Sequence, residues 1–124
     1  MVADWRRFCN VTDLAVDSHA VVVSLPGGRS HRIHVKEEVD AYRLDATVVG
    51  EAVASTLEDL PLETWERNRG TELVGFRIDA KGRLVGTAWV PFAGLTPQEF
   101  RTYLRTVAAE CDRFEFQLTG RDAQ

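Results

Sequence analysis

The amino-acid sequence predicts an α+β domain, in which an antiparallel sheet of about five strands packs against helices on one face. Two observations lead to this fold class. Runs of alternating apolar and polar residues, joined by short turn sequences, indicate hairpins of antiparallel strands. Apolar residues at helical spacing occur between these hairpins and after them. The expected order is helix, three strands, helix, two strands, helix, which is typical of α+β folds.

Composition narrows the class of protein. The 124 residues suit one domain over residues 1–124, with 44% apolar residues and a net charge of −4. No apolar run approaches the roughly 20 residues of a membrane span, and residues 1–30 lack a secretion-signal pattern. The net negative charge, which lies in residues 1–62, disfavours nucleic-acid binding through bulk charge. We therefore expect a soluble cytoplasmic protein without membrane or nucleic-acid partners. Because arginine outnumbers lysine by 13 to 2, we expect a bacterial source.

Residues 1–18 are expected to be weakly structured or to hold one short helix. Asp4 is a suitable N-cap, and Trp5, Phe8 and Cys9 would then share one side of the helix. The next three residues are poor helix formers, so the helix should not exceed two turns.

Residues 20–49 are expected to form three antiparallel strands. A β-branched apolar run over residues 20–25 ends at the turn sequence Pro26-Gly27-Gly28-Arg29. Residues 30–36 and 41–49 then alternate, with a second turn between them. One face would carry His31, Ile33, Val35, Tyr42, Leu44, Ala46 and Val48.

A helical stretch should follow these strands, because Val53, Leu57 and Leu60 share a helical face. Pro61 suits the start of a new helical turn, and Gly70 suits its end.

The pattern of residues 72–90 predicts a hairpin with its turn at Asp79-Ala80-Lys81-Gly82. Gly82 suits the left-handed position that follows a type I turn. Apolar residues fall on both of its faces, which predicts a contiguous exposed apolar patch around Leu73, Val85 and Trp89. The alternative is that a helix covers this face, or that Trp89 lies under the loop at residues 91–92. The candidate partner-binding residues on this face are Leu73, Arg77, Val85, Thr87 and Trp89.

The last helix has the clearest signals. Thr96-Pro97-Gln98-Glu99 is a capping box with proline at the first helical position. An apolar stripe for packing on a sheet or on a partner helix follows, formed by Phe100, Leu104, Val107, Cys111 and Phe114. The tail at residues 119–124 should fray.

No set of catalytic residues emerges from the sequence. His31 and His34 point to opposite faces of one predicted strand, so a single metal ion could not bind both. Cys9 and Cys111 form no CxxC pair and are expected to be reduced thiols. The sequence therefore predicts no enzyme, no cofactor and no metal site. A small enzyme or an RNA-binding domain that uses His31, Arg32 and His34 is a weaker alternative.

The second half of the chain resembles the YbjN and type III secretion chaperone-like families, in an actinobacterial-type form. The shared pattern is a strand that ends near Asp79, the turn Lys81-Gly82-Arg83 and a returning strand to Val90. The run Gly94-Leu95-Thr96-Pro97-Gln98-Glu99 and a final amphipathic helix with Ala108 and Asp112 complete it. The likeness covers about residues 20–118 and includes the order of the elements.

This resemblance implies a twisted antiparallel sheet with helices packed on it, usually in a homodimer. It also implies a non-catalytic, chaperone-like module that holds an extended or partly folded segment of another protein by strand addition and pocket anchoring. Members of the family usually begin with a long amphipathic helix, for which residues 3–12 are too short. An accessory or regulatory subunit of a larger complex is the alternative function.

Overall fold

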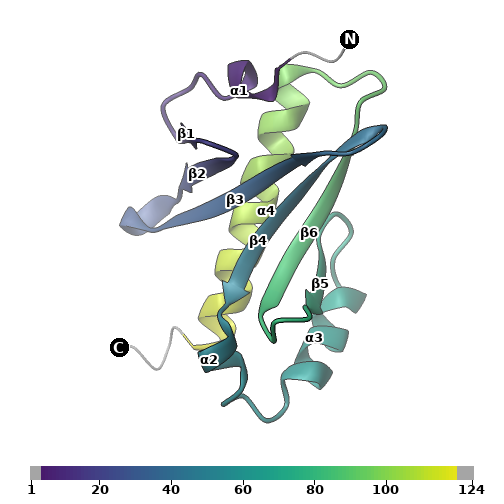
Figure 1. The fold of residues 1–124 in the computed structure, drawn as a ribbon. Helices are drawn as coiled ribbons and strands as arrows, with labels where there is room; N and C mark the ends of the chain where they lie inside the picture. The colour runs from purple at the N-terminus through teal and green to yellow at the C-terminus, as the bar shows by residue number, and fades with distance from the viewer. Residues whose placement is uncertain (1–3, 120–124) are drawn as a thin grey trace.

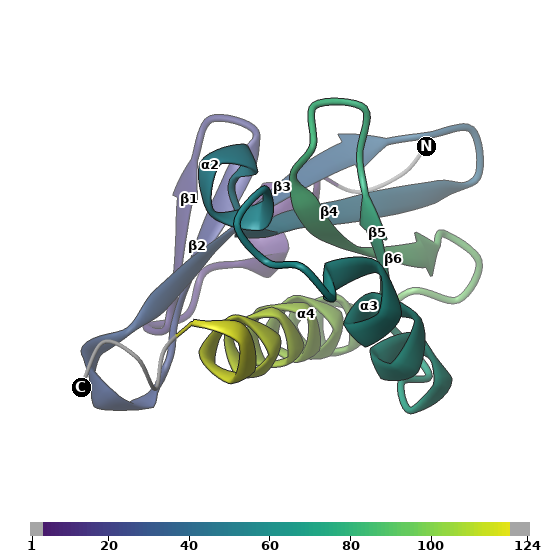
Figure 2. The same ribbon diagram turned by 90° about the horizontal axis from the view of Figure 1, so that it is seen from below.

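The computed structural model describes residues 4–119, which form an antiparallel sheet with the long C-terminal helix on its inner side (Figures 1 and 2). The sheet has six strands in the order β1-β2-β3-β4-β6-β5. The elements in chain order are α1 (Trp5–Phe8), β1 (Leu14–Asp17), β2 (Ala20–Ser24), the 3-10 turn η1 (Pro26–Gly28), β3 (Ser30–Glu37), β4 (Ala41–Val49), α2 (Glu51–Ala54), α3 (Leu60–Arg69), β5 (Gly75–Ile78), β6 (Leu84–Pro91) and α4 (Pro97–Leu118).

The predicted α+β class and antiparallel pairing are confirmed, but the sheet has six strands rather than about five. The additional strand is β1, which lies in a segment that was expected to be weakly structured. Asp17 pairs with Ala20 across a tight turn, in which Ser18 has a φ of 60°. Four residues are too few to show alternation, so pairing with β2 makes this segment a strand. The short helix α1 forms as expected, with Asp4 as its N-cap.

The helical stretch predicted after β4 consists of two helices instead of one. The first, α2, is a single turn, and Val53 on it is exposed. The second, α3, has Pro61 in its first turn and ends at Gly70, as the sequence predicted. Leu60 anchors α3 in the core, whereas Trp65 projects into solvent.

Helix α4 lies across the inner face of the sheet and supplies much of the core (Figure 2). Its capping box forms as predicted, with Glu99 N donating to Thr96 Oγ1 at 3.1 Å and Thr96 N donating to Glu99 Oε1 at 3.0 Å. All residues of the predicted apolar stripe are fully buried: Phe100, Leu104, Val107, Cys111 and Phe114. Burial of each large side chain contributes roughly 1.5–3 kcal/mol.

The tail predicted at residues 119–124 lies outside the described residues from position 120 onward. Thr119 closes α4, because its N–H donates to Glu115 O at 2.8 Å.

Helix α4 and the sheet approach each other closely at Gly86 on β6. A Cβ atom on Gly86 would lie 2.7 Å from Cys111 Sγ and 3.0 Å from Phe76 Cε1. The first distance is shorter than real Cβ contacts and the second is tight, so a larger residue would force its neighbours to shift. Gly86 therefore sets the distance between the helix and the sheet.

The outer edge of β5 is capped by the side chain of Asn68 on α3. Phe76 N donates to Asn68 Oδ1 at 2.8 Å, and Asn68 Nδ2 donates to Phe76 O at 2.8 Å. The amide thus satisfies the two backbone groups that another strand would otherwise pair with. Capping of this kind protects an edge strand against association with a second chain.

Gly86→Ala should lower the free energy of unfolding by about 1–3 kcal/mol, because the added methyl group overpacks the helix–sheet contact. The loss should shrink in a Cys111→Ala background, which removes the nearest atom. Chemical denaturation of both single variants and the double variant measures this coupling. Gly75→Ala on β5 is the control and should be near neutral, since its Cβ would meet no atom within 4 Å. Equal costs at Gly86 and Gly75 would contradict the packing argument.

Asn68→Ala should destabilise the fold by about 1–3 kcal/mol, because it leaves a buried backbone donor and acceptor without partners. Asn68→Asp should also destabilise the fold, since its carboxylate still accepts from Phe76 N but replaces the Nδ2 donor by an oxygen that repels Phe76 O. Denaturation midpoints rank the three proteins, and light scattering tests whether the uncapped edge promotes association. Stability of either variant equal to that of the unaltered protein would argue against the edge cap.

Candidate functional site

The face of the sheet opposite α4 is open along β3, β4 and β6. Side chains of β3 alternate between exposed and buried along the strand, so every second residue points away from the helix. We refer to this surface as the outer face, defined by His34, Arg43, Asp45, Arg77, Thr87 and Trp89. Figure 2 shows α4 on the opposite side of the sheet from this face.

Four of the five predicted partner-binding residues lie on β5 and β6 as expected. On β6, Trp89 is 53% exposed, so the side chain is accessible rather than tucked under the following loop. Val85 is only 5% exposed, and the expected contiguous apolar patch is wrong at this position. The cause is the central place of β6, because Val85 is flanked by its register partners Thr47 on β4 and Arg77 on β5.

Leu73, the fifth predicted residue, precedes the first residue of β5 and is 37% exposed. Leu73 therefore lies outside β5 and has no register partner on β6, whereas strand pairing positions the other four residues. Of the predicted residues that lie within strands, Trp89 is the one whose side chain is both apolar and exposed.

A polar row crosses the outer face between Trp89 and Val85. Thr87 Oγ1 donates to Asp45 Oδ1 at 2.6 Å, and Arg77 Nη1 donates to Thr87 Oγ1 at 2.7 Å. Arg43 Nε donates to the second oxygen of Asp45 at 2.9 Å. The sequence showed no sign of this row, because its members meet only through the pairing of β4, β6 and β5.

The arginines of the outer face differ in their partners. Arg43 pairs with Glu38 and Asp45, and its guanidinium lies 5.8 Å from the centre of the Trp89 ring, which is within range of a cation–π contact. Arg77 donates to the hydroxyl of Thr87 instead of to a carboxylate. Arg77 therefore keeps guanidinium donors for a further acceptor.

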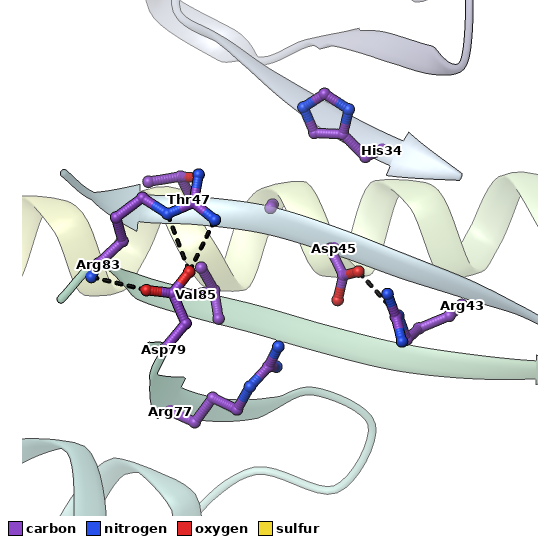
Figure 3. A pocket seen from close by; sticks show the side chains of 9 residues that line it. His34, Arg43, Asp45, Thr47, Arg77, Asp79, Arg83 and Val85 are labelled. Carbon is purple, nitrogen blue, oxygen red and sulfur yellow. Dashed lines mark hydrogen bonds and ion pairs between the residues drawn. The ribbon is translucent and has the colours of Figure 1, made fainter. Parts of the chain in front are cut away.

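A cavity of about 340 Å³ opens beside this row (Figure 3). At one end, Asp79 accepts from Arg83 Nε at 2.9 Å and from the backbone N–H groups of Lys81 and Arg83. These hydrogen bonds, chiefly that from the Arg83 side chain, lower the pKa of the Asp79 carboxyl. Because Asp79 is already paired, the opening presents Arg77 and His34 as donors for a carboxylate or a carbonyl group.

The two edges of the sheet differ. The β5 edge is capped by Asn68, whereas β1 pairs with β2 alone among the strands of the described chain. Ser24 N donates to Asp13 O, so alternate residues of β1 face β2 and the backbone groups of Val16 face outward. A groove of about 670 Å³ runs beside Leu14 and Val16.

The residues considered for enzymatic or RNA-binding activity do not converge. His31 faces the core and is 8% exposed, while His34 lies on the outer face. Arg32 is ion-paired with Asp17 at 2.7 Å. Burial raises the pKa of the Cys9 thiol to about 11 and that of Cys111 to about 12. Thiols with such pKa values stay protonated near neutral pH and are poor nucleophiles.

No helix within residues 4–119 combines the length and the apolar character that crossing a bilayer requires.

Comparison with known proteins supports the fold and shows the family. No curated protein matches the chain. Among solved structures, the fold is similar to a chain in the crystal structure of the ExsC-ExsE complex, with a TM-score of 0.52 and 17% sequence identity. The match covers 90% of this chain and 91% of that chain, which confirms the predicted α+β fold. The sequence model of the YbjN family, described as "Putative bacterial sensory transduction regulator", matches residues 3–119, and the chain therefore belongs to the YbjN family.

Proposed function

We propose that this chain is a non-catalytic protein-binding module that holds an extended segment of a partner protein in the manner of a chaperone. The observation that carries the proposal is the open outer face, where the half-exposed Trp89 lies near Arg77. Tryptophan and arginine are the residue types that most often anchor protein interfaces. The likeness to a chain solved in a two-protein complex supports the same reading.

The outer face favours a particular kind of segment. The Arg77 guanidinium reaches Thr87, which is two residues from Trp89 on the same face of β6. Two residues along a strand span roughly 7 Å, which is also the spacing of side chains i and i+2 in an extended segment. An extended partner with an apolar side chain over Trp89 and an acidic one at Arg77 would match both positions. Val85, Thr87 and Leu73 would border this contact.

An accessory or regulatory subunit of a larger complex is the second candidate function. The description of the family as a sensory transduction regulator favours it. Both functions use the outer face, and they differ in whether the partner is one fixed protein or many unfolded segments. In either case we expect a homodimer that acts in the bacterial cytoplasm.

Trp89→Asp should abolish capture of the partner while the fold stays intact, because the side chain is half exposed and contributes little to the core. Affinity capture from the native host, compared by quantitative mass spectrometry, measures the loss. Trp65→Asp is the matched control, since Trp65 is 57% exposed and also has an arginine, Arg69, beside its ring, but lies on α3. Proteins retained by Trp65→Asp and lost with Trp89→Asp are the expected partners.

Thermal unfolding monitored by circular dichroism accompanies this comparison. Unfolding of the Trp89→Asp protein would show that Trp89 belongs to the core. Capture that is lost in the Trp65→Asp protein and retained in the Trp89→Asp protein would move the binding surface to α3.

Light scattering coupled to size-exclusion chromatography should give twice the mass of one chain. For the captured material, one protein in fixed ratio to the chain supports the subunit function, and a mixture of unfolded segments supports the chaperone function. A monomer at micromolar concentration would contradict the expected homodimer but would leave the binding surface unaffected.

A further inference from the structure

Three side chains with free electron pairs meet on the inner side of the sheet, away from the outer face. They are His31 on β3 and Asp112 and Glu115 on α4, and their ligand atoms all lie within 4.8 Å of one another. The histidine and the two carboxylates are far apart in the sequence, and no short motif joins them. The fold alone creates this cluster.

The gap that admits the cluster comes from the divergence of two strands. The pairing of β3 with β4 extends from Glu37 and Tyr42 only as far as His34 and Asp45. Beyond that pair the two strands separate (Figure 1). His31 lies in the separated part, and its Nε2 is 3.1 Å from the backbone oxygen of Thr47 on β4.

This hydrogen bond assigns the tautomer of His31. A carbonyl oxygen only accepts, so Nε2 carries a proton, and in the neutral imidazole Nδ1 then keeps its lone pair. Nδ1 is fully buried and has no hydrogen-bond partner within residues 4–119. A buried nitrogen without a partner is costly, so His31 Nδ1 calls for a partner from outside the chain, either a water molecule or an ion.

The carboxylates leave room for a cation. Both oxygens of Asp112 accept from Arg29 Nε, at 3.1 and 3.0 Å, and Oδ2 also pairs with Arg29 Nη2 at 2.9 Å, which neutralises one of the two negative charges. Glu115 is one helical turn further along α4 on the same face. Within residues 4–119 no side chain bonds to the Glu115 carboxylate, so Glu115 and His31 Nδ1 are the members of the cluster whose lone pairs are not engaged. A cation between them would be attracted by the Glu115 charge.

The ligand types select the kind of cation. One neutral imidazole nitrogen with two carboxylate oxygens suits Zn²⁺ and related divalent transition ions better than the oxygen-only sites of Ca²⁺ or Mg²⁺. The contact from Nε2 to a backbone carbonyl is the usual support of a metal-binding histidine. An adjoining cavity of about 290 Å³, lined by His31, Thr47 and Glu115 among others, provides access and space for a water ligand.

We propose that His31 Nδ1, Asp112 and Glu115 bind one Zn²⁺-type ion, which fastens the C-terminal half of α4 to β3. Ligand atoms around such an ion lie about 3.4 Å apart, given metal–ligand distances of about 2.1 Å. A rotation of the Glu115 side chain, which is only partly buried, would close the present separation. The site is structural and is independent of the proposed partner binding on the outer face.

Isothermal titration of the chelator-treated protein with zinc chloride tests the proposal. We expect one Zn²⁺ per chain, with binding at least about tenfold weaker in Glu115→Gln and in His31→Gln. His34→Gln is the control for the other histidine on the same strand, which also lines the adjoining cavity, and Glu110→Gln is the control for loss of one carboxylate on the same helix. Both controls should bind Zn²⁺ like the unaltered protein.

Two spectroscopic measurements locate the ion. Co²⁺ should give the visible absorption of a four-coordinate site, and this absorption should be lost in Glu115→Gln. Zn²⁺ should also shift the ¹⁵N resonance of His31 Nδ1 and leave that of His34 unchanged. Because Glu115 is not part of the core, Glu115→Gln keeps the test valid if His31→Gln fails to fold.

Absence of Zn²⁺ and Co²⁺ binding at 100-fold excess over protein would overturn the proposal. It would also be overturned by binding that survives Glu115→Gln unchanged, or by binding that is lost in His34→Gln, since the ion would then lie on the outer face. Binding that weakens equally in Glu110→Gln and Glu115→Gln would show that general surface charge attracts the ion. That result would contradict a defined site.

Discussion

The contact between the apolar stripe of α4 and the inner face of the sheet determines the rest of the structure. The stripe is buried along its whole length, from Phe100 at one end of the helix to Phe114 and Leu118 near the other. Edge-to-face contacts of Phe100 with Tyr42 and of Phe114 with Phe76 join both ends of this contact to the sheet. Since Gly86 brings the two layers close together, the inner face has no room for a second layer. Any partner of the sheet must therefore use the outer face or an edge.

The same contact also organises the outer face, although α4 does not touch it. Side chains along a strand alternate between faces, so the burial of Leu44, Leu84 and Ala88 fixes the register of β4 and β6. This register places Asp45 opposite Thr87 and Arg43 opposite Trp89. A slip of one residue would bury the charged side chains and expose the apolar ones. The arrangement of the proposed binding residues is thus a consequence of core packing on the opposite face.

The sequence predicts the inner face of this fold far better than its outer surface and edges. Periodicity identifies α4, and alternation identifies which residues of β3, β4 and β6 face the core, because both patterns arise from burial itself. The strand β1 has four residues, and its pairing with β2 depends on long-range contacts that no local pattern records. The exposure of Val85 depends on which side chains flank it across the sheet, and the cluster around His31 depends on how α4 crosses diverging strands. Those features require the assembled fold.

The different protection of the two sheet edges bears on how a partner is selected. Asn68 satisfies the backbone of Phe76 on β5, so strand addition there would first have to displace a pair of formed hydrogen bonds. At β1 the outward backbone groups of Val16 need no such displacement. Backbone hydrogen bonds at an edge are nearly the same for every sequence, however, and contribute affinity rather than selectivity. Selectivity requires side chains, which under the proposed function the outer face would supply through Trp89 and Arg77. A segment that is recognised by its own sequence would consequently be distinguished at the outer face, even if it also lengthens the sheet at β1.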